Sequence, residues 1–195
     1  MKRFFRFILF LALLAVGWHI YQTEIVPREK VFELAATSAP DWVDQQFIKV
    51  DGCSRRGVYL ESVQDIVIHY VGNPGSTAQQ NRDYYANPSS EVSSHFVIGL
   101  KGEIIQCIPL HEKSSASNHR NKDTISIEVC HPDASGKFTD AAYQSLVKLT
   151  AWLCETCDLD SDDVIRHYDI TGKQCPLYFV THEGAWEQFK KDVGR

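Results

Sequence analysis

The sequence lacks an excess of positive charge. Its 20 lysines and arginines are outnumbered by 25 aspartates and glutamates, which gives a formal net charge of -5 at pH 7. Proteins that bind nucleic acids use clustered lysine and arginine side chains to displace counterions from the phosphates. We therefore predict that this chain has no nucleic-acid partner.

Internal repeats and low-complexity tracts are missing as well. Hydrophobic residues make up 44% and charged residues 23% of the 195 positions, which is typical of a folded globular domain and unlike disordered or fibrous chains. A chain of this length accommodates one domain and an appendage. We therefore expect a single hydrophobic core.

The first 22 residues differ from the rest of the chain. Lys2, Arg3 and Arg6 precede an apolar run over residues 7–21, a pattern typical of an export signal whose cationic end stays in the cytoplasm. The run is shorter than the roughly 20 residues that cross a bilayer core, although flanking residues extend it. The small-x-small triplet at residues 15–17 is acceptable to a signal peptidase. The segment is thus predicted to be an uncleaved anchor or a cleaved signal peptide, with the remainder outside the cytoplasm.

Cysteine is sparse for an exported chain of this size. The six positions are Cys53, Cys107, Cys130, Cys154, Cys157 and Cys175. Because a domain this large can hold itself together by burial, disulfides are optional and their pairing is open. Cys154 and Cys157 form a C-x-x-C motif at the predicted C-terminal end of a helix, where the helix dipole disfavours a thiolate. A packing or disulfide role is therefore favoured over a redox role.

Residues 23–43 are predicted to form a linker or loosely docked arm, and residues 44–195 the folded domain. Within the domain, turn signals and apolar patterns predict strands at 65–70, 94–100, 103–108, 124–130 and 164–168, and helices at 76–86, 139–157 and 182–193. Lys101 and Gly102 are predicted to form the turn of a hairpin. Strands interspersed with helices predict an α/β fold, a single domain with a central mixed β-sheet flanked by helices.

Five residues have the chemistry of a zinc hydrolase site. His69 ends an apolar strand, and His167 and Cys175 lie eight residues apart across a glycine-containing turn. A lone histidine in such a place is more often a packed residue than a ligand, so the case depends on all three. Two imidazoles and a thiolate suit Zn²⁺, and three protein ligands leave a fourth position open for water. Hydrolysis also requires a base and a cation for the oxyanion, for which Glu128 and Lys173 are candidates.

Four segments in series resemble the motifs of the type 2 N-acetylmuramoyl-L-alanine amidases. They read IVIHYVGN at 66–73, SHFVIG at 94–99, ISIEV at 125–129 and RHYDITGKQCP at 166–176. The resemblance extends over about residues 48–193, and four motifs in the right order are far more specific than any one of them. The family includes phage and sporulation-type cell-wall amidases of Firmicutes and is related to amidase-type phage lysozymes and peptidoglycan-recognition proteins.

The resemblance implies a Zn²⁺ cofactor held by His69, His167 and Cys175. It also implies that Glu128 is the catalytic base and that Lys173 stabilises the oxyanion, although some members place other residues at the lysine position. The expected reaction is hydrolysis of the amide bond between N-acetylmuramic acid and L-alanine in peptidoglycan. The resemblance thus implies an extracytoplasmic enzyme with peptidoglycan as its partner, and we expect a monomer.

The hairpin motif departs from one branch of the family. Amidase-type phage lysozymes and catalytic peptidoglycan-recognition proteins place a tyrosine before the motif histidine, whereas this chain has Ser94 before His95. Because Glu128 is present, we interpret the difference as a choice of branch. His95 is expected in the core, or beside the site as an orienting or substrate-contacting residue. Asn118 and His119 lie where the family forms a groove wall, and they are expected either to contact substrate or to lie in a polar surface loop.

Two other functions are compatible with parts of the sequence. The alternative within the same fold is a non-catalytic peptidoglycan-binding module, since some relatives lose the metal. A binding module has no chemical need for Cys175, Glu128 and Lys173, which argues against it. A thiol-redox membrane protein built around the C-x-x-C motif does not explain His69 and His167.

Overall fold

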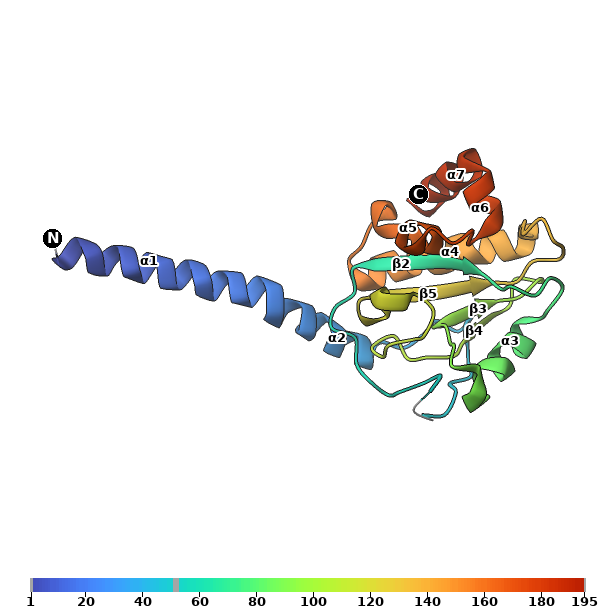
Figure 1. Cartoon of the computed structure of the whole chain (residues 1–195), viewed down its shortest axis with the longest axis horizontal. Helices are drawn as coiled ribbons and strands as arrows, with labels where there is room; N and C mark the ends of the chain where they lie inside the picture. The colour runs from blue at the N-terminus through green and yellow to red at the C-terminus, as the bar shows by residue number, and fades with distance from the viewer. Residues whose placement is uncertain (1, 51–52, 195) are drawn as a thin grey trace.

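The computed structural model describes residues 2–50 and 53–194. Its centre is a mixed six-stranded sheet in the order β1-β4-β3-β5-β2-β6 (Figure 1). The strands are β1 (Asp44–Gln45), β2 (Asp65–Tyr70), β3 (Phe96–Ile98), β4 (Ile104–Gln106), β5 (Thr124–Val129) and β6 (Val164–Arg166). Only the β3–β4 pair among them is antiparallel. The predicted mixed sheet is confirmed.

Helices cover both faces of the sheet. The α-helices are α1 (Lys2–Ile20), α2 (Val26–Ala36), α3 (Ala78–Tyr85), α4 (Asp140–Cys157), α5 (His167–Thr171), α6 (Leu177–Thr181) and α7 (Glu183–Val193). A π-helical turn, η1 (Tyr21–Ile25), joins α1 to α2, and short 3-10 turns lie at η2 (Pro88–Ser90), η3 (Asn118–Lys122) and η4 (Ser161–Asp163). The larger apolar cluster joins one face of the sheet to α2, α4, α6 and α7, and a smaller one joins the other face to α3.

The alternation of β5 separates the core from the site. Ile125, Ile127 and Val129 are fully buried in the larger cluster. Successive side chains of a strand point to opposite faces, so Ser126 and Glu128 project from the other face. Because β5 lies inside the sheet, Glu128 is not on an exposed edge.

Helix α4 is the largest element packed on the core face. The hydroxyl of Thr139 accepts a hydrogen bond from the backbone N–H of Ala142 at 3.1 Å, which caps the first turn as expected for an N-cap threonine. Leu146, Leu149 and Leu153 recur at three- and four-residue spacing and are fully buried. The helix predicted over residues 139–157 is confirmed.

The predicted hairpin forms, with shorter strands than expected. Gly102 has a φ of 86°, and a Cβ atom there would lie 2.8 Å from the carbonyl oxygen of Ala141 on α4. Both the left-handed conformation and the close approach require glycine. The turn therefore sets β3 and β4 against the start of α4.

The C-terminal part of the domain differs from the prediction in two places. Strand β6 ends at Arg166, and His167 begins α5 instead of continuing a strand to residue 168. The Asp169 carboxylate accepts a hydrogen bond from the Arg166 backbone N–H at 2.8 Å, which caps the new helix and stops the strand. Helix α6 was not predicted either, because five residues are too few to show a helical period.

The segment predicted as a linker or arm is helical as far as Ala36, and its second half packs against the domain. Val31 and Leu34 are 2% and 3% exposed and belong to the larger core cluster, as does Val43. Trp42 packs edge-to-face against Trp152 of α4, with ring centroids 6.1 Å apart. The packed part of the chain therefore starts within α2.

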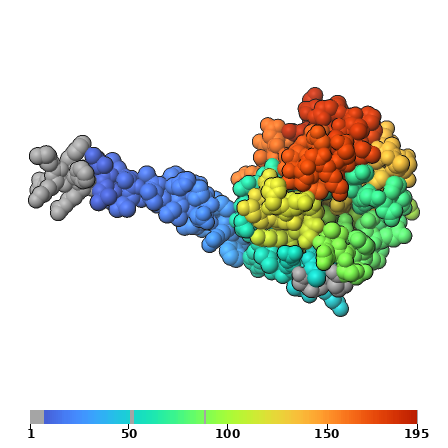
Figure 2. Space-filling model, viewed as in Figure 1, coloured from blue at the N-terminus to red at the C-terminus, as the bar shows by residue number. Residues whose placement is uncertain are grey.

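The N-terminal helix extends away from the domain as an arm (Figure 2). The helical stretch Ile8–Ala36 is long and apolar enough to cross a membrane, and its most apolar window is not buried against the protein. A signal sequence can have the same length and apolar composition. The side chains of Lys2, Arg3 and Arg6, on which the predicted orientation rests, lie outside the described part of the structure.

The C-x-x-C motif packs in the core at the end of α4. Cys154 and Cys157 are buried free thiols, as are Cys107, Cys130 and Cys175. Burial raises the pKa of Cys154 to about 11 and that of Cys157 to about 12. Such thiols are weak nucleophiles, which fits the predicted packing role.

Candidate active site

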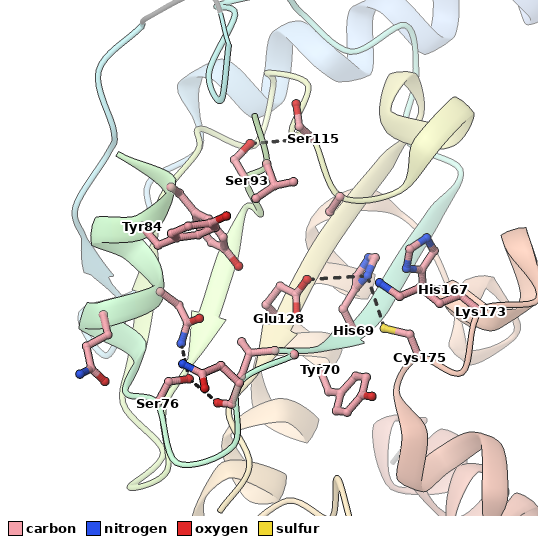
Figure 3. A pocket seen from close by; sticks show the side chains of 18 residues that line it. His69, Tyr70, Ser76, Tyr84, Ser93, Ser115, Glu128, His167, Lys173 and Cys175 are labelled. Carbon is pink, nitrogen blue, oxygen red and sulfur yellow. Dashed lines mark hydrogen bonds and ion pairs between the residues drawn. The ribbon is translucent and has the colours of Figure 1, made fainter. Parts of the chain in front are cut away.

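Three side chains with metal-ligating atoms meet on the α3 side of the sheet (Figure 3). One ligand atom each of His69, His167 and Cys175 lies within 4.8 Å of the other two, and all three residues are buried. They come from β2, from the start of α5 and from the segment before α6. Residues about 100 positions apart in sequence are thus brought into one cluster.

The sheet register places Glu128 next to His69. The two residues are paired across the parallel strands β5 and β2, so their side chains lie on the same face. Glu128 Oε1 is 3.9 Å from His69 Nδ1, and that same nitrogen is 3.9 Å from Cys175 Sγ. A carboxylate therefore lies beside the cluster of candidate ligands.

A backbone hydrogen bond holds together the segments that carry His167 and Cys175, and ion pairs fix the start of α5. The backbone N–H of Tyr168 donates to the carbonyl oxygen of Cys175 at 2.9 Å, which closes the loop between the two candidate ligands. Arg166, just before His167, pairs with Asp169 at 3.0 Å and with Glu183 at 2.7 Å. These contacts fix the start of α5, and with it the histidine, against α7.

Each histidine has a hydrogen-bond partner at Nε2. His69 Nε2 is 3.3 Å from Ser117 Oγ, and His167 Nε2 is 2.8 Å from Asn118 Oδ1. Within the part of the chain that the structure describes, buried His167 Nδ1 and Glu128 Oε2 have no hydrogen-bond partner. Buried polar atoms without partners are rare and costly. Two imidazoles and a thiol with such an unpaired atom fit a zinc ion.

Burial sets the charge state of the cluster. It lowers the pKa of His69 well below 6.5, and the neighbouring His167 and Lys173 lower it further. The pKa of His167 is lowered by burial and by Lys173. Both rings are therefore neutral near pH 7, which is the form that binds a metal.

The two acidic groups of the site shift in the opposite direction. Burial raises the pKa of Glu128 to about 8, and the Lys173 ammonium opposes this rise. Burial, followed by the charge of Glu128, raises the pKa of Cys175 to about 12. Both groups are thus held in an environment that favours a compensating cation.

The cluster lies in a cleft of about 530 Å³ that opens to solvent. Its walls come from the end of β2, helix α3 and the chain around residues 92–93 and 115–116. The lining includes Asn73, Gln80, Asn81, Tyr84, Tyr85, Val92, Ser93, Ser115 and Ala116, together with the charged residues described above. Tyr84 is 56% exposed. The cleft thus offers neutral polar groups and an aromatic ring to a ligand.

His95 does not reach the cleft. It is fully buried, its Nε2 lies 2.8 Å from the Glu112 carbonyl oxygen, and its Nδ1 accepts from the Ser126 backbone N–H at 3.0 Å. The expectation of a substrate contact is therefore not met, because both ring nitrogens are used inside the core. Ser94 is also fully buried, and its Oγ bonds to the Ser126 carbonyl oxygen at 2.9 Å.

The other two predicted substrate contacts lie in η3. Asn118 bonds to His167, as described above. His119 is exposed and is not among the residues that line the cleft, so its contact with substrate stays a prediction. Sequence reasoning missed Ser117, because one serine in a serine-rich loop shows no periodic signal. It also missed Tyr84 and Tyr85, which look like ordinary residues of α3.

Comparisons with known proteins agree with this geometry. The family model described as N-acetylmuramoyl-L-alanine amidase matches residues 59–177. This chain belongs to that family. The match contains His69, Glu128, His167, Lys173 and Cys175, and the predicted family is confirmed.

Relatives and solved structures extend the comparison. The chain is 32% identical over 168 residues to the N-acetylmuramoyl-L-alanine amidase BlyA of Bacillus subtilis (strain 168), covering 75% of this chain and 45% of BlyA. It is 29% identical over 168 residues to the amidase CwlL of Bacillus licheniformis, covering 77% of this chain and 46% of CwlL. The chain thus spans about half the length of these relatives. A mutant endolysin from Bacillus subtilis superposes with a TM-score of 0.68 and 28% identity, covering 78% of this chain and 98% of the endolysin.

Proposed function

We propose that this protein is a zinc-dependent N-acetylmuramoyl-L-alanine amidase that hydrolyses the bond between N-acetylmuramic acid and L-alanine in peptidoglycan. The observation that carries the proposal is the cluster of His69, His167 and Cys175 with Glu128 beside it in an open cleft. Membership of the amidase family and the names of the relatives support the same reaction.

His69, His167 and Cys175 would hold the metal. A zinc ion bound there would polarise the amide carbonyl and lower the pKa of a water molecule. Glu128 would accept the proton of the attacking water at its carboxylate and pass it to the leaving amine. Lys173 lowers the pKa of Glu128, against the effect of burial, and so favours the ionised form that a base requires.

Lys173 would stabilise the charge that develops on the reacting carbonyl. Its side chain lines the cleft beside the histidines (Figure 3), and its charge lowers the pKa values of both. An ammonium group in this position would donate a hydrogen bond to the oxyanion of the tetrahedral intermediate. A cation that acts on the transition state in this way raises the rate more than it raises substrate affinity.

The substrate would enter along α3. Tyr84, exposed at the cleft, offers a ring face to a sugar or to an apolar part of the stem peptide, and Gln80, Asn81 and Asn73 offer amide groups to its hydroxyls and peptide bonds. We place the enzyme, a monomer, outside the cytoplasmic membrane, where peptidoglycan lies. Residues 1–22 would serve as anchor or export signal, and residues 44–195 would form the amidase domain.

The test is product analysis. The full-length protein, solubilised in mild detergent, is incubated with purified peptidoglycan in the presence of zinc and then with a chelator, and the released peptides are identified by mass spectrometry. We expect stem peptides with a free L-alanine amino terminus in the zinc sample alone. Binding to the wall without such peptides under either condition would replace the amidase by the non-catalytic binding module.

A further inference from the structure

We infer that the dipeptide Ser117-Asn118 positions the two histidines of the proposed zinc site, by holding both rings at Nε2 so that both present Nδ1 to the metal. The inference rests on the function proposed above but concerns residues to which neither the family match nor the motifs give this role. Its basis is that adjacent residues of one turn contact both histidines, which come from different elements.

The contact to His69 is made inside the protein. Ser117 is fully buried, and its Oγ lies 3.3 Å from His69 Nε2. The other ring nitrogen, Nδ1, faces Cys175 Sγ and Glu128 Oε1, each at 3.9 Å. A serine hydroxyl can accept from an N–H group. Because the Ser117 hydroxyl can also donate to Nε2, this contact alone admits either tautomer. We assign the proton of the neutral ring to Nε2 and the lone pair to Nδ1, which faces Cys175 Sγ.

The contact to His167 determines its tautomer more strictly. Asn118 Oδ1 lies 2.8 Å from His167 Nε2, and an amide oxygen only accepts hydrogen bonds. The neutral ring must then carry its proton on Nε2. His167 Nδ1 is left as a buried lone pair with no partner in the described residues. A metal ion would bind at this nitrogen.

The turn that carries the two residues is braced independently of the histidines. Asn121 Oδ1 accepts from the backbone N–H groups of Ala116 and Ser117 at 3.1 and 2.6 Å. Asn118 has a φ of 55°, a left-handed conformation that asparagine tolerates better than most residues. The dipeptide is thus held by contacts that do not involve the histidines.

For the metal, the consequence is that both histidine rings are already oriented before it binds. Hydrogen bonds to the outer nitrogen of a ligating histidine orient the ring and select the tautomer, and their loss costs about 10- to 100-fold in metal affinity. We expect Ser117 and Asn118 to act through the histidines, without contact to the metal. They are positioning residues and not catalytic ones.

The experiment compares full-length variants in detergent. Asn118→Gly removes the side chain but keeps the left-handed backbone accessible, and Asn118→Asp keeps an acceptor oxygen. Ser117→Ala removes the second contact. Lys122→Ala, at an exposed lysine of the same turn that faces Glu61 at 3.6 Å, is the matched control. Zinc and cobalt affinities are measured by competition with a chromophoric chelator, and histidine tautomers are read from ¹⁵N shifts in the metal-free protein.

We expect Nε2–H tautomers for His69 and His167 in the unaltered chain. We expect zinc affinity to fall about 10- to 100-fold in Asn118→Gly and Ser117→Ala, with mixed tautomers at the histidine that lost its partner. Asn118→Asp and Lys122→Ala should bind zinc as the unaltered chain does. If the unaltered chain binds zinc tightly, and if Asn118→Gly and Ser117→Ala change neither the zinc affinity nor the tautomers, the inference is wrong. The proposed zinc site would then still stand. An unaltered chain that binds neither metal would overturn the proposed zinc site as well.

Discussion

Glu128 is a carboxyl group placed where burial raises its pKa to about 8 and leaves one oxygen without a partner in the described residues. Placing an acid there costs stability, so its presence needs a compensating role. Glu128→Gln keeps the shape and removes the proton acceptor. We expect the release of stem peptides to fall by about 10²- to 10⁴-fold, the usual contribution of a general base, with zinc content unchanged. Activity equal to that of the unaltered enzyme would contradict the assignment.

Two variants make this result specific. Glu155→Gln, at an exposed carboxylate on α4, should leave both turnover and zinc content unchanged. Cys175→Ala removes a proposed ligand and should lose zinc together with activity. A base and a metal ligand are distinguished by the zinc content of the Glu128 and Cys175 variants. Metal analysis of the purified proteins measures this content.

His95 gives a prediction on pH and stability. Burial lowers its pKa to about 4, and its Nδ1 already accepts from the Ser126 N–H, so the folded protein holds the neutral ring. The unfolded chain titrates near the ordinary value of 6.5. The contribution of His95 to stability is therefore complete above pH 6.5. It falls as the pH falls from 6.5 to 4, because the unfolded state then takes up a proton that the native state refuses.

The expected slope from this one group approaches about 1.4 kcal/mol per pH unit, or about 3 kcal/mol over the interval. The check is urea unfolding of the metal-free protein at pH 7, 6, 5 and 4, compared with His95→Gln, whose side chain does not titrate. The variant should be less stable at pH 7 and should lose less stability on acidification. Parallel curves for the two proteins would rule out this role of His95.

At the scale of elements, the sequence predicted those strands and helices whose apolar residues recur at a regular spacing. Apolar patterns predicted the strand that contains Glu128 and the helix over residues 139–157, because the contacts of both elements repeat along the element. The end of β6 and the start of α5 at His167 depend on a single capping contact from Asp169. The turn η3 depends on Asn121. Such local polar contacts have no period, so their geometry emerged only in three dimensions.

Helix α3 forms a wall of the cleft and depends on its N-terminal cap. Thr77 Oγ1 accepts from the Gln80 backbone N–H at 3.2 Å, and the Gln80 side chain accepts from the Thr77 N–H at 2.9 Å. Thr77→Ala leaves one of these donors to water, and we expect a loss of about 1 kcal/mol in the free energy of unfolding. Thr77→Ser keeps the hydroxyl and should retain most of the stability. Denaturant titration of the two variants measures the difference, and equal losses in both would show that the hydroxyl is not the cause.

At the scale of the whole molecule, one helical path leads from the apolar arm into the core. Helix α1 continues through η1 into α2, where Val31 and Leu34 are buried in the main cluster. The arm is thus joined to the domain without a flexible linker between them in the described residues. If α1 crosses the membrane, this continuous helical path holds the domain close to the membrane surface.

Membrane insertion of α1 can be tested with two substitutions on the same helical path. Leu13 is 62% exposed within the apolar run, and Phe32 is 62% exposed on α2, outside that run. Aspartate at the centre of a spanning helix costs about 2.5 to 3.5 kcal/mol of insertion free energy, whereas aspartate beyond the bilayer costs little. We therefore expect Leu13→Asp to shift the protein from the carbonate-resistant membrane fraction towards the soluble fraction, and Phe32→Asp to leave it membrane-bound. Mass spectrometry of the membrane-bound protein should find the chain intact at its N-terminus. A soluble unaltered protein that begins at Trp18 would instead establish a cleaved signal peptide, because cleavage there removes most of the apolar run.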